Sequence, residues 1–395
     1  MPTRRVLISG AGIAGPTLAY WLLQHGFAPT LVERAPAPRT GGYMIDFWGV
    51  GYDVADRMGL VPALERVGYR LNEFRLVDRV GRRVASFDGR SFAEATGGRY
   101  SSLLRGDLAR CILEAIDGRA ETIFGDSLRA LDDDGDGVVA TFERAAPRRF
   151  DLVVGADGLH SKVRALAWGD DARAEQYLGY CVASFAADGY PHRDEGAYVS
   201  YGTPGRQAAR YALRGGRSAF LLVFARDEPL PPGHHRRAVQ EAVLREVFGG
   251  TGWECDEILA RMSDAPDLYF DVVSQIRLAS WSRGRAVLLG DAAACPSLLS
   301  GQGSALAMAG AYVLAHELSA ASGDHAAAFA RYERHFKPFV DAKQRAAAGF
   351  ATWFAPRTPL RLWLRNTVTR LMRFPSIART VLAPSVTDRF TLPDA

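Results

Sequence analysis

Short apolar runs that break at glycine open the chain. Val6-Leu7-Ile8 predicts a buried strand, a helical run follows through Gln24, and Thr30-Leu31-Val32 predicts a second strand. Leu152-Val153-Val154 is a further buried run, and another leads into Gly290. Strands that alternate with helices are typical of a parallel sheet, so these segments predict an α/β fold.

The pattern changes between residues 175 and 280. Short β-rich runs follow one another there, separated by glycine, proline and aspartate turns, and they predict an antiparallel sheet. Helical patterns occur at about 236–248 and 254–262, and again at 304–318 and 326–349. The chain therefore combines a parallel α/β part with a second part built on an antiparallel sheet.

Residues 359–374 form the last strongly periodic stretch. Helical spacing separates an apolar face from a basic one: Leu360, Trp363, Leu364, Val368 and Leu371 on the first, and Arg365, Arg370 and Arg373 mostly on the second. A basic amphipathic helix is able to lie on a membrane. Packing across the two domains is the favoured interpretation.

Composition adds a few constraints. With 395 residues, the chain is long enough for two modules that share a groove. A net charge of +4 is too small to indicate nucleic acid as a partner. Four scattered cysteines are typical of a reducing cytoplasm, and neither they nor the His234-His235 pair predict a metal site. The first strand begins almost at the N-terminus and the apolar runs are short, so we expect neither a signal peptide nor a membrane partner.

The first glycine cluster has the spacing of a dinucleotide-binding turn. Gly10 allows a tight turn, Gly12 lets backbone N–H groups approach a pyrophosphate at the helix N-terminus, and Gly15 lets helix and strand pack closely. Glu33 ends the second strand, where an acid accepts hydrogen bonds from a ribose. Arg34 would suit a 2′-phosphate, but Glu33 would repel that group, so an ADP moiety with a free ribose is favoured.

Two further glycine turns follow the later apolar runs. The central turn contains Asp157-Gly158, and by itself it is typical of a strand that ends before a capped helix. The late turn contains Gly290-Asp291 and is followed by Gly301-Gln302-Gly303, so the backbone is expected to approach a partner closely there. Between the first two clusters, Asp107 is expected to cap a helix.

The order and spacing of the three clusters resemble the group A FAD-dependent aromatic hydroxylases. These are the flavoprotein monooxygenases with a para-hydroxybenzoate hydroxylase-like fold, and the tetracycline- and polyketide-oxidising members are the most similar in character. The resemblance covers roughly residues 4–350, and it departs from the family at Ala294 and Ala305, where His and Asn are usual.

This resemblance implies a division of the chain into domains. The fold would be α/β, with a Rossmann-like FAD-binding domain, an inserted antiparallel-sheet substrate domain and a C-terminal helix. We expect the FAD-binding domain in residues 1–174 and 281–350, the substrate-binding domain in 175–280, and a helical segment that bridges the domains in 351–395.

The resemblance also implies how an extended FAD would lie. Glu33 would bind the adenosine ribose, Leu128 would contact adenine through its backbone, and Arg105 would reach the pyrophosphate or ribityl region. Asp291 would hydrogen-bond the ribityl hydroxyls, and residues 301–304 would present N–H groups to the flavin N1–C2 edge. The expected FAD-binding residues are Gly10, Gly12, Ile13, Ala14, Gly15, Glu33, Arg34, Asp46, Arg105, Leu128, Asp157, Asp291, Gly301, Gly303 and Ser304.

A reaction chamber beside the flavin is implied as well. Residues 41–48 would lie next to the isoalloxazine in this family, although alone they are typical of a β-hairpin, and Asp46 is the candidate for the chamber wall. The second domain would form the roof. A minority of its strand aromatics would face the chamber, because aromatics in strands more often belong to the core; the candidates are Tyr198, Tyr201, Tyr211, Phe220 and Phe224.

The activity implied is hydroxylation of an aromatic or polycyclic small molecule. NADPH or NADH would reduce the FAD, and O₂ would add at flavin C4a to give a hydroperoxide whose distal oxygen passes to an electron-rich carbon. Because the cofactor carries the chemistry, no catalytic triad or carboxylate pair is expected. A flavin oxidase or reductase on the same fold is the alternative, and a non-catalytic FAD-binding carrier is a less favoured one.

Overall fold

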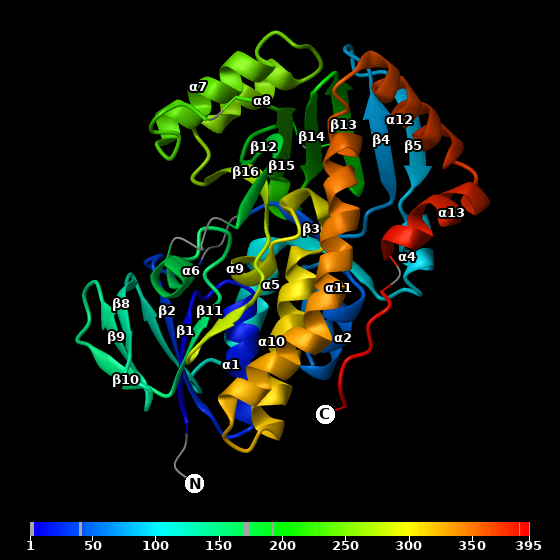
Figure 1. Cartoon of the computed structure of the whole chain (residues 1–395). Helices are drawn as coiled ribbons and strands as arrows, with labels where there is room; N and C mark the ends of the chain where they lie inside the picture. Colours follow the sequence, from blue (N-terminus) through cyan, green and yellow to red (C-terminus); the bar gives the residue numbers. More distant parts are fainter. Residues whose placement is uncertain are drawn as a thin grey trace.

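Two large sheets, joined by long helices, form the frame of the molecule (Figure 1). The structure is a computed structural model. It describes residues 4–38, 42–169, 174–191, 193–228, 230–386 and 388–394. Gly41, which belongs to the segment expected beside the isoalloxazine, lies outside the described residues.

The first sheet is largely parallel and carries the first glycine turn. Its strand order is β17-β18-β11-β1-β2-β7, and β1 lies in parallel between β11 and β2. Only β17 runs antiparallel to its neighbour. The strands are β1 (Arg5–Ser9), β2 (Ala28–Glu33), β7 (Glu121–Phe124), β11 (Leu152–Gly155), β17 (Ser282–Arg283) and β18 (Ala286–Leu288). The strands predicted from the apolar runs are therefore confirmed, as is the α/β fold with a Rossmann-like sheet.

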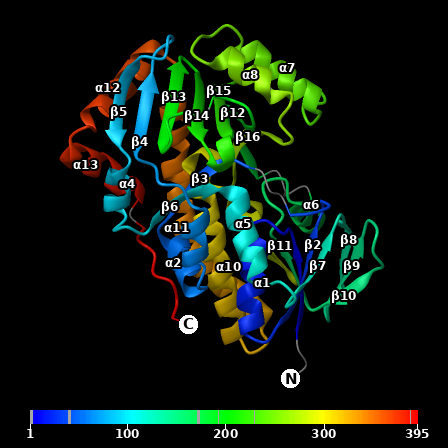
Figure 2. The ribbon, with the colours of Figure 1, turned by 180° about the vertical axis from the view of Figure 1, so that it is seen from behind.

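Helices α1 (Ala14–Gln24) and α10 (Gly303–Ala320) pack against each other beside this sheet. Nearly every residue of α10 is buried, because α1, α2 (Val50–Arg57) and α11 (His325–Phe354) contact it. Both views show α11 running from the first sheet to the second (Figures 1 and 2). These contacts bring the helix that follows the late glycine turn next to the helix that follows the first one.

The second sheet has seven strands and is antiparallel except at one pair. Its order is β16-β12-β15-β14-β13-β4-β5, and β4 pairs in parallel with β13. Its strands are β4 (Glu73–Val77), β5 (Arg83–Asp88), β12 (Glu175–Ala187), β13 (Ala197–Thr203), β14 (Arg206–Ala212), β15 (Ser218–Ala225) and β16 (Leu268–Ile276). Residues 73–88 thus join the sheet built mainly by residues 175–280, although the expected division put them with the FAD-binding part.

The two faces of the second sheet have different neighbours. Helices α7 (Arg237–Phe248) and α8 (Cys255–Met262) cover one face and bury Phe220, Phe224 and Ile258 against it. On the other face, the Tyr211 hydroxyl accepts a hydrogen bond from the backbone N–H of Met44. That face therefore looks toward β3 (Met44–Trp48), which pairs with β6 (Tyr100–Leu104).

The remaining elements connect these layers. A small antiparallel sheet contains β8 (Leu128–Asp133), β9 (Val138–Phe142) and β10 (Arg148–Phe150). The other helices are α3 (Val61–Val67), α4 (Arg90–Ala95), α5 (Arg105–Glu114), α6 (Lys162–Trp168), α9 (Asp291–Ala294), α12 (Pro359–Leu371) and α13 (Pro375–Val386), with short 3-10 turns at Arg214–Gly216 and Leu298–Ser300. Among the described residues, no helix has both the length and the apolar character needed to cross a membrane.

Helix α5 begins three residues earlier than expected. Its first residue is Arg105, preceded by Leu104 in extended conformation, so Asp107 lies inside the first turn instead of capping it. The Asp107 carboxylate pairs with Arg110 on the next turn. The prediction of a cap at Asp107 was therefore wrong, because the strand β6 continues directly into the helix.

Helix α12 packs on the second sheet through its polar side. Arg365 and Thr369 are only 4% and 5% exposed, whereas Leu360, Trp363 and Leu364 are 72%, 62% and 52% exposed. The helix contacts β5 and β13. The expectation that its apolar face would pack across the domains was therefore wrong, because the Gln207 side chain and the Phe354 carbonyl offer acceptors that draw the Arg365 side chain inward.

Candidate functional site

The first glycine turn brings backbone against backbone. Gly10 has a φ of +105°, and a Cβ on it would lie 2.4 Å from the carbonyl oxygen of Ala156. A Cβ on Gly15 would lie 2.0 Å from the carbonyl oxygen of Gly10. No side chain is compatible with either contact. The turn from β1 into α1 is therefore as close as the dinucleotide interpretation requires.

Glu33 lies beside this turn at the end of β2. Its carboxylate accepts hydrogen bonds from the backbone N–H groups of Ala11 and Ala35, both at 2.9 Å. Each carboxylate oxygen has a second lone pair, so the group is still able to accept from a ribose. Arg34 is exposed next to it. The ribose contact of Glu33 stays a prediction.

The adenine contact expected of Leu128 is close to the same strand end. The Asp126 N–H donates to the Glu33 carbonyl at 3.1 Å, and the Gly125 N–H donates to the Ala35 carbonyl at 2.8 Å. These bonds bring the start of β8 beside the end of β2, where Leu128 is fully buried. The neighbourhood is suited to the adenine end of the cofactor, and the contact itself stays a prediction.

Arg105 places an unpaired cation at the open side of the first turn. A Cβ on Gly12 would lie 3.7 Å from its Nη2 atom, and its guanidinium has no hydrogen-bond partner among the described residues. Burial opposes its charge, but four nearby groups together outweigh burial and raise the pKa of Arg105: Tyr43, Asp291, Tyr269 and Glu33. A guanidinium held this close to backbone N–H groups at a helix start favours a pyrophosphate. The residues of this turn therefore fit the ADP half of FAD.

The late glycine turn positions a carboxylate at the start of α10. Gly290 has a φ of +62° and leads into α9, whose first residue is Asp291. A Cβ on Gly303 would lie 3.5 Å from the Asp291 Oδ1 atom. Burial raises the pKa of Asp291, although Arg105 and the Cys295 thiol oppose this shift. A buried carboxylate with so few protein donors suits a ribityl chain, which offers several hydroxyls.

The N-terminus of α10 lies in the same place. Gln302 precedes the helix without a side-chain cap, and the first residues of the helix are Gly303 and Ser304. The first N–H groups of a helix have no intrahelical acceptor and carry partial positive charge. They therefore suit an electron-rich group, such as the pyrimidine edge of a flavin.

Two buried amides, which the sequence pattern did not single out, hold the loop between α9 and α10. The Gln275 side chain donates to the Pro296 carbonyl at 2.9 Å, and the Gln344 side chain donates to the Cys295 carbonyl at 2.9 Å. Ser297 in this loop has a φ of +114°, which a non-glycine residue rarely adopts. Such strain persists only where the surroundings hold it. No local motif marks these amides, because their partners lie far away in the chain.

Asp46 lies on β3 and is bonded to its neighbour strand. Its carboxylate accepts hydrogen bonds from the hydroxyls of Tyr100 and Ser102 on β6. Burial raises the pKa of Asp46, and these two hydrogen bonds act in the opposite direction. The strand faces the inner side of the second sheet through the Met44–Tyr211 bond, and the place of Asp46 in the chamber wall stays a prediction.

Two of the five candidate roof aromatics lie on this inner side. Tyr198 and Tyr211 stack with ring centroids 6.2 Å apart, and both belong to the side that meets β3. Tyr201, Phe220 and Phe224 pack in the core under α7 and α8. Strand alternation explains this division, because neighbouring residues of a strand point to opposite faces. Tyr43 and Tyr269, whose rings lie 5.4 Å apart, are further aromatics near Arg105 and Asp291.

Asp157 and the two departures from the family pattern have structural partners. The Asp157 carboxylate accepts from the Ser9 and Ser161 hydroxyls and from two backbone N–H groups that begin α6. It joins β1 to α6, and its expected contact with FAD stays a prediction. Ala305 meets Gly51, on which a Cβ would lie 2.3 Å from the Ala305 Cα atom. The close crossing of α2 and α10 accounts for a small residue at 305, while Ala294 is buried without a comparable partner.

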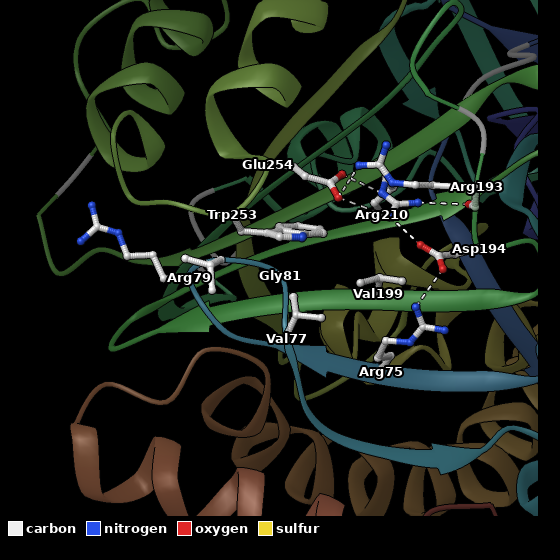
Figure 3. A pocket seen from close by; sticks show the side chains of 11 residues that line it. Arg75, Val77, Arg79, Gly81, Arg193, Asp194, Val199, Arg210, Trp253 and Glu254 are labelled. Atoms are coloured by element: carbon white, nitrogen blue, oxygen red, sulfur yellow. Dashed lines mark hydrogen bonds and ion pairs between the residues drawn. The ribbon is translucent and has the colours of Figure 1, made fainter.

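A hollow of about 290 Å³ lies elsewhere, beside the start of α8 (Figure 3). Arg210 is fully buried there and donates to Asp194 and Glu254, both at 2.8 Å. Arg75 also pairs with Asp194, and Arg193 pairs with Glu254. These ion pairs satisfy every charged group of the lining except Arg79, whose side chain points away from them in Figure 3, and none of the expected FAD-binding residues lines the hollow. We therefore place the functional site at the glycine turns.

Comparison with other proteins shows the family of the chain. The family model described as FAD binding domain matches residues 3–346. An uncharacterized protein of Mycobacterium tuberculosis (strain H37Rv) is 41% identical over 345 residues, which are 86% of this chain and 92% of the relative. A protein of Legionella longbeachae named flavin-dependent monooxygenase is 34% identical over 357 residues, and the match covers 88% of each chain.

Solved structures share the arrangement of both sheets. The crystal structure of tetracycline destructase Tet(55) matches with a TM-score of 0.85 and 32% identity, and the match covers 100% of both chains. HpxO of Klebsiella pneumoniae, solved with FAD and uric acid, matches with a TM-score of 0.79 over 97% of this chain and 96% of that chain. Its identity of 23% shows a likeness of fold alone.

Proposed function

Since the chain belongs to the FAD-binding-domain family of flavin-dependent monooxygenases, we propose that it hydroxylates an aromatic or polycyclic small molecule of the tetracycline or polyketide kind, with NADPH or NADH as electron donor. FAD is its cofactor and O₂ its co-substrate, as in the rest of the family. The likeness to a tetracycline destructase at 32% identity supports the substrate class. We place the reaction in the cytoplasm, where both donors occur.

One observation carries the assignment of FAD to this site. The unpaired Arg105 guanidinium lies beside Gly12, and it responds electrostatically to both Asp291 and Glu33. An acid at the first turn and an acid at the late turn thus both lie close enough to act on the charge of one cation. A long molecule with an anionic centre and hydroxyls toward both ends complements this arrangement. FAD has this form, with a pyrophosphate between a ribose and a ribityl chain.

The protein side of the reaction follows from the same geometry. FAD, when bound, supplies electron transfer and the activation of oxygen. The uncapped N–H groups at the start of α10 would stabilise negative charge that gathers on the pyrimidine edge during reduction. The apolar and aromatic side chains around Tyr198, Tyr211 and Tyr43 would exclude water from the substrate and orient its ring. Asp46 would keep the wall of the chamber rigid through its two hydroxyl partners.

The electron donor is expected to bind only transiently. The sequence contains one dinucleotide fingerprint, and we assign it to FAD. NADPH or NADH would then approach along the surface of the groove, without a Rossmann domain of its own. Donor oxidation should be slow without substrate, because a gated flavin reaches the donor mainly when substrate is bound.

The decisive experiment measures both the oxidation of the electron donor and the fate of the oxygen atoms of O₂. We expect NADPH or NADH oxidation to be stimulated by a phenolic or polyketide ligand, and one atom of labelled O₂ to appear in the product by mass spectrometry. An oxidase would send both oxygen atoms to hydrogen peroxide and leave the product unlabelled. A carrier would bind FAD and show no ligand-dependent donor oxidation. Either of these outcomes, obtained with a ligand that demonstrably binds, contradicts the proposal.

A further inference from the structure

The outward side of the two C-terminal helices is the most apolar part of the described surface. Nine large hydrophobic residues are strongly exposed, and six of them lie within 22 consecutive positions. We call this surface the C-terminal apolar face; it consists of Leu360, Trp363, Leu364, Leu371, Phe374 and Val381. Scattered exposed apolar residues need no explanation, but a set concentrated in one short segment indicates an interaction surface.

The segment is also free of negative charge. Residues 342–387 contain eight lysines and arginines and no aspartate or glutamate. Four of these arginines are exposed, and none of the four forms an ion pair with a described carboxylate: Arg361, Arg370, Arg373 and Arg379. Exposed arginines such as Arg66 and Arg129 also lack an ion pair with a described carboxylate, so what distinguishes this segment is that it contains no acidic residue. The C-terminal apolar face therefore lies within uncompensated positive charge.

The orientation of α12 is fixed from the inner side. Arg365 donates to the Gln207 side chain at 3.1 Å and to the Phe354 carbonyl at 3.2 Å, and the Thr369 hydroxyl bonds within the helix. Rotating the helix to bury Leu360 and Trp363 would break both Arg365 contacts and leave their two acceptors facing apolar side chains. The apolar side chains therefore remain available to something outside the chain.

We propose that α12 and α13 dock on the surface of an anionic phospholipid membrane. The leucines, Trp363 and Phe374 would enter the boundary between headgroups and acyl chains, and the arginines would contact lipid phosphates. This goes beyond the proposed activity, because it concerns where the enzyme works. It also replaces our expectation that no membrane is a partner, which rested on the short apolar runs and on the interpretation that the apolar side of residues 359–374 is covered within the protein.

The properties of the C-terminal apolar face argue against a second copy of the chain or a nucleic acid as its partner. Two copies joined through this face around a two-fold axis would bring arginines against arginines. Nucleic acid would match the arginines but would leave the leucines uncovered. An anionic lipid surface offers both phosphates and hydrocarbon, and it therefore complements both properties of the face.

Vesicle sedimentation of the FAD-loaded enzyme tests the proposal. We expect the enzyme to sediment with vesicles of phosphatidylcholine mixed with phosphatidylglycerol, to bind much less to phosphatidylcholine alone, and to dissociate as salt is raised. The double variant L360S/W363S should lower the partition coefficient by roughly tenfold or more, because two apolar side chains no longer enter the bilayer. R370Q/R373Q should reduce binding to the anionic vesicles and weaken its salt dependence.

Arg149 supplies a control for R370Q/R373Q. It is exposed on β10, which both views place on the other side of the molecule from α12 (Figures 1 and 2), so R149Q should leave vesicle binding unchanged. Flavin absorbance and donor oxidation should be unaltered in all three variants, which separates this proposal from the proposed activity. Equal binding to neutral and anionic vesicles, or no sedimentation at all, would overturn it. So would a halving of the mass by light scattering in L360S/W363S, which would show that a second copy covers the face.

Discussion

Two regions of the molecule differ in how much space their packing leaves for side chains: the turn between β1 and α1, and the inner side of helix α12. At the turn, Gly15 brings its backbone against the Gly10 carbonyl, and no side chain fits between them. On α12, the inner side has room for the long side chain of Arg365, while Trp363 and Leu364 point outward. The turn between β1 and α1 therefore admits only glycine at positions 10 and 15. The inner side of α12 is polar because neighbouring residues provide hydrogen-bond acceptors for Arg365.

This difference shows when a sequence pattern is enough to predict which side of a segment is buried. A close backbone contact is a local steric fact, so the glycine is needed whatever surrounds the turn. A helix only presents two faces, and the rest of the protein decides which of them is covered. In α12, hydrogen-bond acceptors on Gln207 and Phe354 outweighed the apolar stripe.

The largest effect is expected from Gly15→Ala. A Cβ would lie 2.0 Å from the Gly10 carbonyl oxygen and 3.1 Å from the Ile8 side chain, so β1 and α1 would have to separate. We expect the free energy of unfolding to fall by about 3 kcal/mol or more, with loss of FAD. Urea denaturation and flavin absorbance measure both. Gly349→Ala is the control, since open space surrounds that position in α11, and it should be neutral or slightly stabilising. Equal behaviour of the two variants would refute our account of the turn.

A smaller loss, confined to the cofactor, is expected from Arg105→Gln. The guanidinium has no hydrogen-bond partner among the described residues, so the apoprotein should keep its stability. A charged contact to the pyrophosphate is worth about 1.5–3 kcal/mol, which corresponds to a rise of roughly 10- to 150-fold in the Kd for FAD. Equilibrium titration of the apoprotein measures this change. Arg110→Gln on the same helix should leave the Kd unaltered, and an unaltered Kd in Arg105→Gln as well would mean that FAD does not pass Arg105.

Substitutions at two adjacent residues of α12 test whether its polar side is the packed side. Arg365→Met should lower the free energy of unfolding by about 1–2 kcal/mol, because the buried Gln207 side chain and the partly buried Phe354 carbonyl lose their donor. Leu364→Ser, on the outward side, should change it by less than about 0.5 kcal/mol. If Leu364→Ser were the more damaging change in denaturation experiments, the apolar stripe would be the packed side after all.

The same variant has a distinctive pH dependence. Burial lowers the pKa of Arg365 to about 10, below the 12.5 of an unburied arginine. Between these values the folded protein binds fewer protons than the unfolded chain, so the wild-type protein gains stability as pH rises. The cost of burying the charge is present in full below pH 10. The stability difference between wild type and Arg365→Met should therefore widen above pH 10, and a difference that stays constant would contradict the burial of a charged Arg365.

The smallest effect is expected at an exposed pair between the two parts of the protein. His160 follows the central glycine turn and bonds to Asp271 on β16, which raises the pKa of His160. The stabilisation that this ion pair gives the folded protein is therefore present in full below pH 6.5, and it is lost as pH rises through the raised pKa of His160 in the folded state. Because the histidine is about half exposed, His160→Gln should cost less than about 0.5 kcal/mol at acidic pH and nothing at alkaline pH. A larger cost at alkaline pH than at acidic pH would show that the contact is not an ion pair.

The sequence by itself determined the elements whose conditions are local. The glycine spacing at 10–15, the acid at Glu33 and the apolar runs of β1, β2 and β11 all lie where the pattern predicted. A tight turn, a buried strand and a helix start each depend on residues within one short segment. The family resemblance could therefore be read from three such segments in order.

Only the tertiary structure decided which distant segments meet. It paired β4 and β5 with the second sheet, brought Gln275 and Gln344 to the loop before α10, set Tyr269 beside Tyr43, and turned the polar side of α12 inward. In each case the partner lies far along the chain. The free energy of such a contact depends on which surfaces remain open after the other elements have packed, and no periodicity within one segment contains that information.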